Sequence, residues 1–359
     1  MHAASTPASA THKITDYKLA AAGLNNTALK DQAIMKAVIC TRYGAPKYLK
    51  IIDRLIPVPA ADEVLIKVHA ASVTAADTMM RRGKPKFSRL FLGLRRPKAQ
   101  TPGTGFAGIV ISVGSDVTKF ACGDRVFGET GLKFSAHAEY VCLKADALLI
   151  NTPTVLSACE AACICDGALT SYNFLIELGQ LKPSDRVLII GASGSLGTAA
   201  VQLAKHFGAS VTAVCSAKNS ALVRALGADH VIDYTTRDFH TQSNSYDLIY
   251  DCIGKSSYRQ SKQALTKNGR YLSPVLNVSL LLSVLSSKLF GSKRALFSAT
   301  GIKALPELKH MLAELIPLYM AGDLSTVIDR RYRIEQTVEA NRYVDTERKR
   351  GNVVLMMHD

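Results

Sequence analysis

The sequence contains no apolar run long enough to cross a lipid bilayer. Residues 280–285 form the best candidate, and they fall far short of the roughly 20 apolar residues that a membrane-spanning helix needs. The first 34 residues also lack the apolar core of a secretory signal, contain no Arg and include Asp16, so they make a poor transit peptide. We expect residues 1–34 to be a disordered extension, or an upstream start ahead of Met35. The expected compartment is the cytoplasm, with organellar import through residues 1–34 as the alternative.

Acidic residues are scarce, with 29 Asp and Glu against 44 Lys and Arg, which gives a formal net charge of +15. Such a charge would suit nucleic acid or an anionic membrane. No zinc finger, RNA-binding signature or long basic tail accompanies it, so we expect no nucleic-acid partner. A phosphorylated cofactor and a local basic cluster explain the excess more simply. A composition with 48% hydrophobic and 20% charged residues indicates a globular protein, and 359 residues allow two domains.

Metal-ligand patterns are missing as well. The closest cysteines, Cys159, Cys163 and Cys165, lack a C-x-x-C spacing and lie in an Ala-rich stretch of helical character. In a chain without a secretory signal we interpret them as small buried apolar side chains. We therefore expect no metal site.

What the sequence does contain is a glycine turn between a strand and a helix. Residues 187–190 form a short apolar run typical of a strand that is buried on both faces. Gly191, Gly194 and Gly197 follow at intervals of three, and then apolar residues recur at helical spacing up to Phe207. A second apolar strand, residues 210–215, completes a βαβ unit. Glycines at such a turn let the backbone approach a pyrophosphate at the start of the helix, so we predict a dinucleotide site.

The acid that usually accepts hydrogen bonds from the ribose of NAD is missing from this unit. No Asp or Glu occurs between Asp185 and Asp229. Ser216 and Lys218 follow the second strand instead, and a hydroxyl and an ammonium group there suit a 2′-phosphate. A solvated surface lysine is the alternative interpretation of Lys218. We therefore predict NADPH (NADP) as the cofactor in preference to NAD.

Two fold patterns follow each other along the chain. From residue 35 to about 165, strand-like runs separated by Gly, Pro and Asp predict a β-rich barrel or sandwich; these runs are 38–40, 48–56, 64–73, 108–113 and 140–143. From about 166 to 305, strands alternate with helices, which predicts an α/β doubly wound parallel sheet. Its later strands are predicted at 231–234, 246–250, 270–276 and 295–298. We expect residues 306–359 to return to the first domain through two helices and strands at 327–332 and 353–357.

Several motifs resemble the quinone oxidoreductase branch of the medium-chain dehydrogenase/reductase superfamily. They are the glycine-turn segment 188–204, Leu226-Gly-Ala-Asp229 and Val231-Ile-Asp-Tyr234. The resemblance extends from Met35 to Leu355, which is nearly the whole chain apart from the first 34 residues. It implies a chaperonin-10-like catalytic domain followed by a Rossmann domain, and a homodimer, because relatives are commonly dimers.

The resemblance also implies a zinc-independent enzyme. The zinc enzymes of the superfamily place a Cys in the segment that matches residues 72–77 and a His-Glu pair in the segment that matches residues 103–108. Neither Cys nor His occurs in either segment here. The four close cysteines of the structural zinc lobe are absent too, because only Cys122 lies between Gly103 and Tyr140.

The proton donor is less well defined. Metal-free members carry an Asn-Pro-x-Asp segment, sometimes with a nearby Tyr, where this chain has Thr74-Ala-Ala-Asp77 and Met79. Thr74 keeps a hydroxyl donor at the Asn position, but the Tyr is missing. His137 is the other candidate acid, although a lone His is more often structural. Water is the third possibility.

For the cofactor, the resemblance assigns residues position by position. Thr170 would approach the nicotinamide, and Ser195 and Leu196 would offer N–H groups to the pyrophosphate. Tyr234 joins Ser216 and Lys218 around the 2′-phosphate. The remaining positions line the cofactor trough or reach back from the C-terminal motif: Ile253, Gly254, Leu276 and Asn352.

Residues 81–98 form the most unusual segment. They include eight Arg or Lys and no acid, interleaved with Phe and Leu. Such a segment would be able to touch an anionic membrane surface. Two Pro, two Gly and its position after the substrate segment instead favour a lid over the active site, or a solvated basic loop. Membrane contact is the less favoured interpretation.

Together these features predict a zinc-independent, NADPH-dependent oxidoreductase that reduces a quinone or an α,β-unsaturated carbonyl by hydride transfer. Among enzymes, the alternatives are an alcohol/aldehyde dehydrogenase and an enoyl thioester reductase. From another class, the chain would be an NADPH-binding, membrane-associated or regulatory protein with little turnover.

Overall fold

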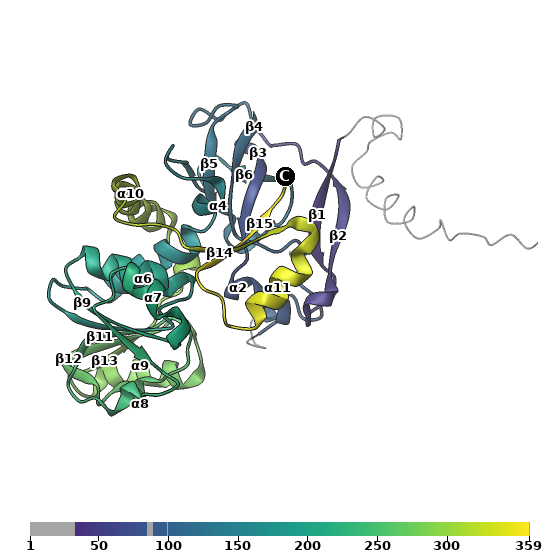
Figure 1. Cartoon of the computed structure of the whole chain (residues 1–359). Helices are drawn as coiled ribbons and strands as arrows, with labels where there is room; N and C mark the ends of the chain where they lie inside the picture. Colours follow the sequence, from purple (N-terminus) through teal and green to yellow (C-terminus); the bar gives the residue numbers. More distant parts are fainter. Residues whose placement is uncertain (1–32, 85–88, 99, 359) are drawn as a thin grey trace, which may run out of the picture.

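The structure is a computed structural model that describes residues 33–84, 89–98 and 100–358 (Figure 1). The expectation for residues 1–34 therefore lies almost wholly outside the described residues; Ile34 opens the first strand, β1. Two bodies of different architecture follow each other along the chain. The purple-to-blue β-rich domain lies at the upper right of Figure 1, and the teal-to-green α/β domain lies at the lower left.

The β-rich domain is built on one large sheet that the end of the chain completes. The strand order is β14-β15-β3-β4-β5-β7, β6 also pairs with β3, and β1 and β2 form a separate pair. All pairings are antiparallel except β14 with β15. The strands are β1 (Ile34–Cys40), β2 (Leu49–Leu55), β3 (Glu63–Ser72), β4 (Gly105–Val113), β5 (Arg125–Glu129), β6 (Tyr140–Lys144), β7 (Leu148–Asn151), β14 (Ile328–Arg333) and β15 (Asn352–Met356).

The second domain is a parallel six-stranded sheet in the order β10-β9-β8-β11-β12-β13. Counted from its first strand, this is the 3-2-1-4-5-6 order of a doubly wound nucleotide-binding sheet, so the predicted α/β fold class is confirmed. The strands are β8 (Arg186–Ile190), β9 (Ser210–Cys215), β10 (His230–Asp233), β11 (Tyr246–Asp251), β12 (Leu265–Leu272) and β13 (Arg294–Leu296). The α-helices in the described part of the chain are α2 (Ala75–Arg82), α3 (Arg89–Leu92), α4 (Ala158–Ala161), α5 (Thr170–Tyr172), α6 (Ser195–His206), α7 (Ser220–Ala225), α8 (Tyr258–Ser261), α9 (Val278–Leu289), α10 (Leu305–Ala321) and α11 (Thr337–Asp345).

One strand differs clearly from its prediction. The run 270–276 was expected to be the strand, but β12 ends at Leu272, and Pro274 follows without a backbone N–H to donate. Leu276 consequently lies in the loop beyond the strand and is 36% exposed. The short strands β5 and β7 were not predicted at all.

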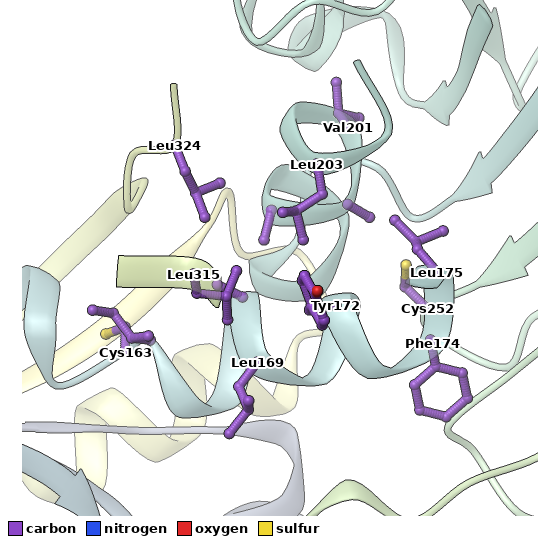
Figure 2. Packing of buried hydrophobic residues seen from close by; sticks show 14 of the residues in the cluster. Cys163, Leu169, Tyr172, Phe174, Leu175, Val201, Leu203, Cys252, Leu315 and Leu324 are labelled. Carbon is purple, nitrogen blue, oxygen red and sulfur yellow. The ribbon is translucent and has the colours of Figure 1, made fainter. Parts of the chain in front are cut away.

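A helical stretch, residues 158–178, joins the two domains and fills one core. Leu169, Tyr172 and Phe174 of this stretch belong to one buried cluster with Leu203 of α6 and Leu315 of α10, and Figure 2 shows Tyr172 close to the two leucines of the other helices. Cys163 and Cys165 are buried in the same core, and burial raises the pKa of both thiols far above its ordinary value. Their environment agrees with the interpretation as small apolar side chains.

Arg81, the first residue of the basic segment, ties α2 to the C-terminal helix α11. Its side chain is 1% exposed, and its Nη2 lies 2.6 Å from Asp345 Oδ2. The same guanidinium donates to Asn341 Oδ1 at 3.2 Å and to the carbonyl oxygen of Gly44. Arg82 also pairs with Asp345, at 2.9 Å. Two cations of segment 81–98 therefore hold the fold together.

We expect Arg81→Ala to lower the free energy of unfolding by about 2–4 kcal/mol, because it leaves a largely buried carboxylate and two acceptors without their donor. Chemical denaturation would measure the loss. Lys144→Ala is the matched control, since the Lys144–Asp62 pair is about half exposed on both sides and its loss should cost far less. Equal losses for the two variants would contradict the structural role of Arg81.

Candidate functional site: the carboxyl edge of the parallel sheet

The carboxyl ends of the parallel strands share one edge of the sheet. In the register, Ile190 of β8 lies beside Val214 of β9 and Asp251 of β11, while Asp233 of β10 lies beside Cys215. Ligands of doubly wound sheets bind outside this edge. Residues that follow the strand ends therefore line it, and they include five of the predicted cofactor positions: Gly191, Ser216, Tyr234, Ile253 and Gly254.

The turn after β8 requires glycine at two of its three glycine positions and leaves space for a side chain at the third. Gly191 has a φ of +77°, a left-handed conformation that favours glycine. A Cβ on Gly197 would overlap the carbonyl oxygen of Gly191, so the helix approaches the turn as closely as a backbone allows. A Cβ on Gly194 would meet only the Gly191 oxygen, at 3.5 Å. Space therefore remains at the outer side of the turn.

Helix α6 begins at this turn with no side-chain cap on its N-cap residue, Gly194. Ser195 and Leu196 are its first two residues, and Ser195 Oγ lies 2.7 Å from Nζ of Lys349 and 3.1 Å from Asp166 Oδ2. An uncapped helix start with a cation beside it suits a phosphate group. The residues present therefore fit the pyrophosphate of a dinucleotide.

Lys349 was not among the predicted residues. It precedes β15 in the C-terminal return, and Gly351 N donates to the carbonyl oxygen of Ser193 at 2.8 Å, which ties this loop to the glycine turn. The two adjacent cations directly before Gly351, Lys349 and Arg350, were a sequence signal for positive charge in this loop. Without knowledge of the fold, however, nothing in the sequence places it beside Ser195.

A second polar group faces the same turn. Asn219 is buried, and its Nδ2 donates to Ser193 Oγ at 2.9 Å. Its Oδ1 has no hydrogen-bond partner within the described part of the chain. A buried amide oxygen without a donor is costly, so this position fits a ligand or water that would supply one.

The predicted 2′-phosphate corner lies beyond β9. Ser216 starts the short 3-10 helix η6 (Ala217–Asn219), and Lys218 is exposed on it. Tyr234, after the neighbouring strand β10, is 62% exposed. The carboxylate of Asp233 is already engaged, because its Oδ1 accepts from Thr235 N at 3.0 Å and Thr235 Oγ1 at 2.8 Å. Lys218 makes no ion pair or hydrogen bond among the described residues, which leaves its charge available.

Asp251 shapes the next loop. Its carboxylate is buried and accepts from four successive backbone N–H groups, those of residues 253–256, and from the Tyr271 hydroxyl at 2.9 Å. This arrangement places Ile253, 46% exposed, at the sheet edge. Leu276, in the loop after β12, lies farther from its strand end than the sequence predicted.

Thr170 and Asn352 lie where the two domains meet. Thr170 opens α5 and is partly buried. Asn352 is buried, and its Nδ2 donates to the carbonyl oxygen of Val327 at 3.1 Å. Gly167 lies close to both Ser195 and Asn352, since a Cβ there would lie 3.3 Å from Ser195 O and 3.8 Å from Asn352 Oδ1.

Thr74 is the N-cap of α2 and is 1% exposed. Its hydroxyl donates to Asp77 Oδ2 at 2.8 Å and accepts from Asp77 N at 3.0 Å, and its own N–H donates to Asp77 Oδ2 at 2.8 Å. This reciprocal arrangement is a capping box. To donate a proton to a substrate, the hydroxyl would have to leave the Asp77 carboxylate.

His137 is fully buried, and its Nε2 lies 2.8 Å from the carbonyl oxygen of Ser72. A carbonyl only accepts, so Nε2 carries a hydrogen, and Nδ1 has no partner among the described residues. A Cβ on Gly103 would collide with the ring, so the site is tightly filled. This geometry fits the structural role that we weighed for His137 better than the catalytic one.

The segments that hold zinc in zinc-dependent relatives do meet here. A Cβ on Gly105 would lie 2.7 Å from Ser72 Oγ, so residues 72–77 and 103–108 are neighbours. Within residues 33–84, 89–98 and 100–358, no group of three His, Cys, Asp or Glu is arranged to hold a metal ion. Zinc independence stays a prediction.

Two carboxyl groups in this region were missed from the sequence. Glu129, at the end of β5, has its pKa raised to about 7, mainly by burial and then by the nearby charge of Asp166, against a hydrogen bond from the Thr104 side chain. Burial also raises the pKa of Asp166, which Lys349 partly offsets. Glu129 would therefore hold a proton near neutral pH. Because its partners are distant in sequence, no local pattern marks it.

The described part of segment 81–98 lines a small pocket. Arg81, Leu92 and Pro97 contribute to its wall, together with Pro102 and Phe134. Arg89 stacks over the Tyr43 ring at 4.6 Å and donates to the Gly83 carbonyl oxygen at 3.0 Å. Residues 85–88 lie outside the described residues, and the assignment of the segment as a lid stays a prediction.

Family models match two parts of the chain. The alcohol dehydrogenase GroES-like domain matches residues 60–172, and the zinc-binding dehydrogenase model matches residues 226–355. The chain is 31% identical to the 2-methylene-furan-3-one reductase of Solanum lycopersicum over 348 residues, or 94% of this chain and 82% of that protein. It is 32% identical to the chloroplastic quinone-oxidoreductase QR1 of Triphysaria versicolor, over 86% of this chain and 94% of that protein.

A solved structure is similar over the same extent. The quinone oxidoreductase from Coxiella burnetii superposes with a TM-score of 0.81 at 31% identity, covering 91% of this chain and all of that one. Among the residues that the structure describes, no helix is long and apolar enough to traverse a membrane.

The raised pKa of Glu129 predicts a pH-dependent stability. The folded protein binds this proton more tightly than the unfolded chain, whose ordinary value is 4.5, so the free energy of unfolding falls as the pH rises from 4.5 to about 7. Glu129→Gln removes the penalty and should stabilise the protein by about 1–3 kcal/mol above pH 7, with little effect below pH 4.5. Urea unfolding at several pH values would test this. The exposed Glu339→Gln is the control, and a pH-independent difference for Glu129→Gln would refute the prediction.

Proposed function

Because the chain belongs to the medium-chain dehydrogenase/reductase superfamily, in its quinone oxidoreductase-like branch, we propose that it uses NADPH to reduce a quinone or an α,β-unsaturated carbonyl compound. It is a nicotinamide-dependent reductase of that branch. The choice of NADPH over NADH and the class of substrate are the parts that we propose.

One observation carries the proposal: groups that can bind phosphate occur at two places along the edge of the parallel sheet. Lys349 lies at the uncapped start of α6, and Ser216 and the unpaired Lys218 follow the next strand. A pyrophosphate and a 2′-phosphate need donors and positive charge at these two places. The absence of an acid between Asp185 and Asp229 favours the phosphorylated cofactor.

The names of the relatives support the substrate class. One is a reductase of a methylene-furanone and the other is a quinone oxidoreductase, and both compounds offer an electron-poor carbon conjugated to a carbonyl. A reduced nicotinamide supplies a hydride to such a carbon when it is bound. The chain's own residues position the two reactants and supply a proton to the carbonyl side.

For that proton we favour water or Glu129 over Thr74 and His137. Thr74 and His137 are both buried and already engaged in hydrogen bonds to the protein. Glu129 is only partly buried, lies within electrostatic reach of Asp77 and Asp166, and retains its proton near neutral pH. A proton held near the operating pH is what general acid catalysis requires.

The cofactor proposal predicts different effects for two lysines. Lys218→Ala should weaken NADPH binding by about 1–3 kcal/mol and leave NADH binding nearly unchanged, because only NADPH carries the 2′-phosphate. Lys349→Ala should weaken both cofactors to a similar extent, because both carry the pyrophosphate. Fluorescence titration without substrate measures both affinities. Equal losses for the two cofactors in Lys218→Ala would show that this lysine does not meet the 2′-phosphate.

The substrate proposal is tested by following NADPH oxidation with a quinone, an enone, an aldehyde and an enoyl thioester. We expect turnover with the quinone or the enone. Turnover confined to the aldehyde or the thioester would favour an alcohol/aldehyde dehydrogenase or an enoyl thioester reductase. Tight NADPH binding with no turnover of any of them would favour a binding protein.

A further inference from the structure

Helix α9 presents an apolar face to the solvent. Val278, Leu281, Leu282, Leu285 and Leu289 recur at helical spacing, and all five are exposed. Phe290 follows directly and is 74% exposed, as is Leu289. We call these six residues the α9 face. A contiguous exposed set of large apolar side chains is unusual on a soluble surface and marks an interaction site.

Helix α9 buries only a small part of its apolar surface. Its buried positions are Leu280 and Ser287, and Ser287 Oγ accepts from Ala295 N of β13 at 2.9 Å. Leu280 and the partly buried Val284 also pack against the core of the domain, while the other leucines point outward. A surface helix normally buries its apolar stripe and exposes its polar one. Packing within the domain therefore does not account for the leucines.

The surroundings of the α9 face are basic. No Asp or Glu occurs between Asp251 and Glu307, a stretch that holds nine Lys or Arg. Three of these pair with carboxylates elsewhere: Lys255 with Glu347, Arg270 with Asp185 and Lys303 with Glu307. The other six have no carboxylate partner within the described part of the chain: Arg259, Lys262, Lys267, Lys288, Lys293 and Arg294.

These cations come from α9 and the elements beside it. Lys288 belongs to α9. Arg259 belongs to α8 and Arg294 to β13, and these two elements contact α9. Lys293 Nζ donates to the backbone carbonyl oxygens of Lys262 at 2.8 Å and of Leu265 at 2.7 Å, so its ammonium group is held close to the protein. Figure 1 shows α8, α9 and β13 gathered at the lower end of the α/β domain.

We propose that the α9 face is a docking surface for an anionic lipid bilayer, with the leucines inserted at the interface and the surrounding cations on the headgroups. An apolar stripe with Lys and Arg around it is the composition of helices that lie in the membrane plane. At 12 residues, α9 is too short to span the hydrocarbon.

A second copy of the chain fits this surface less well. In a two-fold interface the same patch meets itself, so the exposed cations of α8 and α9, Arg259 and Lys288, would be brought toward their own copies. A bilayer that carries phosphate headgroups supplies the missing negative charge. Charge complementarity therefore favours lipid over self-association at α9.

The test is flotation of the full chain with vesicles of phosphatidylcholine, with and without phosphatidylglycerol. We expect binding to the anionic vesicles that weakens as salt rises, because exposed charges are screened over about 10 Å at 0.1 M. Leu282→Gln/Leu285→Gln should lower vesicle binding by at least about tenfold, since each leucine removed loses buried apolar area. Both residues are exposed, so urea unfolding should confirm that the double variant remains folded.

Two control variants separate local docking from general effects. Val58→Gln/Leu132→Gln removes exposed apolar residues of the other domain and should leave vesicle binding unchanged. Arg259→Gln/Lys288→Gln should weaken binding more than Lys50→Gln/Lys119→Gln, which removes the same net charge from the β-rich domain.

The proposal is overturned if anionic vesicles bind no better than neutral ones, or if the two charge variants are equally impaired. It is also overturned if sedimentation shows a dimer that Leu282→Gln/Leu285→Gln converts to a monomer while vesicle binding is unaffected. That result would assign the α9 face to a second copy.

Discussion

The close approach of backbone to backbone at the turn between β8 and α6 is the constraint on which the site depends. Gly197 brings the helix so near to Gly191 that no side chain fits between them. The same turn is tied to the C-terminal return by the hydrogen bond from Gly351 N to the carbonyl oxygen of Ser193. One turn therefore sets both the direction of the helix start and the position of Lys349 beside it. A residue near the end of the chain thereby becomes part of a site that begins at residue 191.

Signals that are local in sequence predicted the parts of the fold that are local in space. The apolar strand, three glycines and helical periodicity of residues 187–207 gave β8, the turn and α6 nearly to the residue. The short strands β5 and β7 carried no such signal, because five and four residues with partners elsewhere show little periodicity. Strand β12 ended before its predicted limit, since Pro274 follows it.

The residues of the candidate site also fall into those that a local sequence signal marks and those that none marks. Residues directly after strand ends, such as Ser216 and Ile253, lie at the sheet edge because parallel strands end there together. Lys349 and Glu129 were missed, since their roles depend on partners far away in sequence. The capping role of Thr74 was missed for a different reason. Thr74-Ala-Ala-Asp77 matches a capping box, and this pattern was visible in the sequence, but the resemblance to the family favoured a catalytic role.

The net charge of +15 is unevenly distributed over the structure. Beside the start of α6, in addition to burial, the charges of Asp166 and Asp77 raise the pKa of Glu129, Asp77 also raises the pKa of Asp166, and Lys349 lowers the pKa of Asp166. Around α9 the balance is reversed, because unpaired cations surround an apolar face. Binding of an anionic cofactor near Lys349 would add negative charge beside Asp166 and so favour the protonated carboxyl groups there. If the pyrophosphate binds at this helix start, as we propose, cofactor binding and the protonation of Glu129 should be coupled electrostatically.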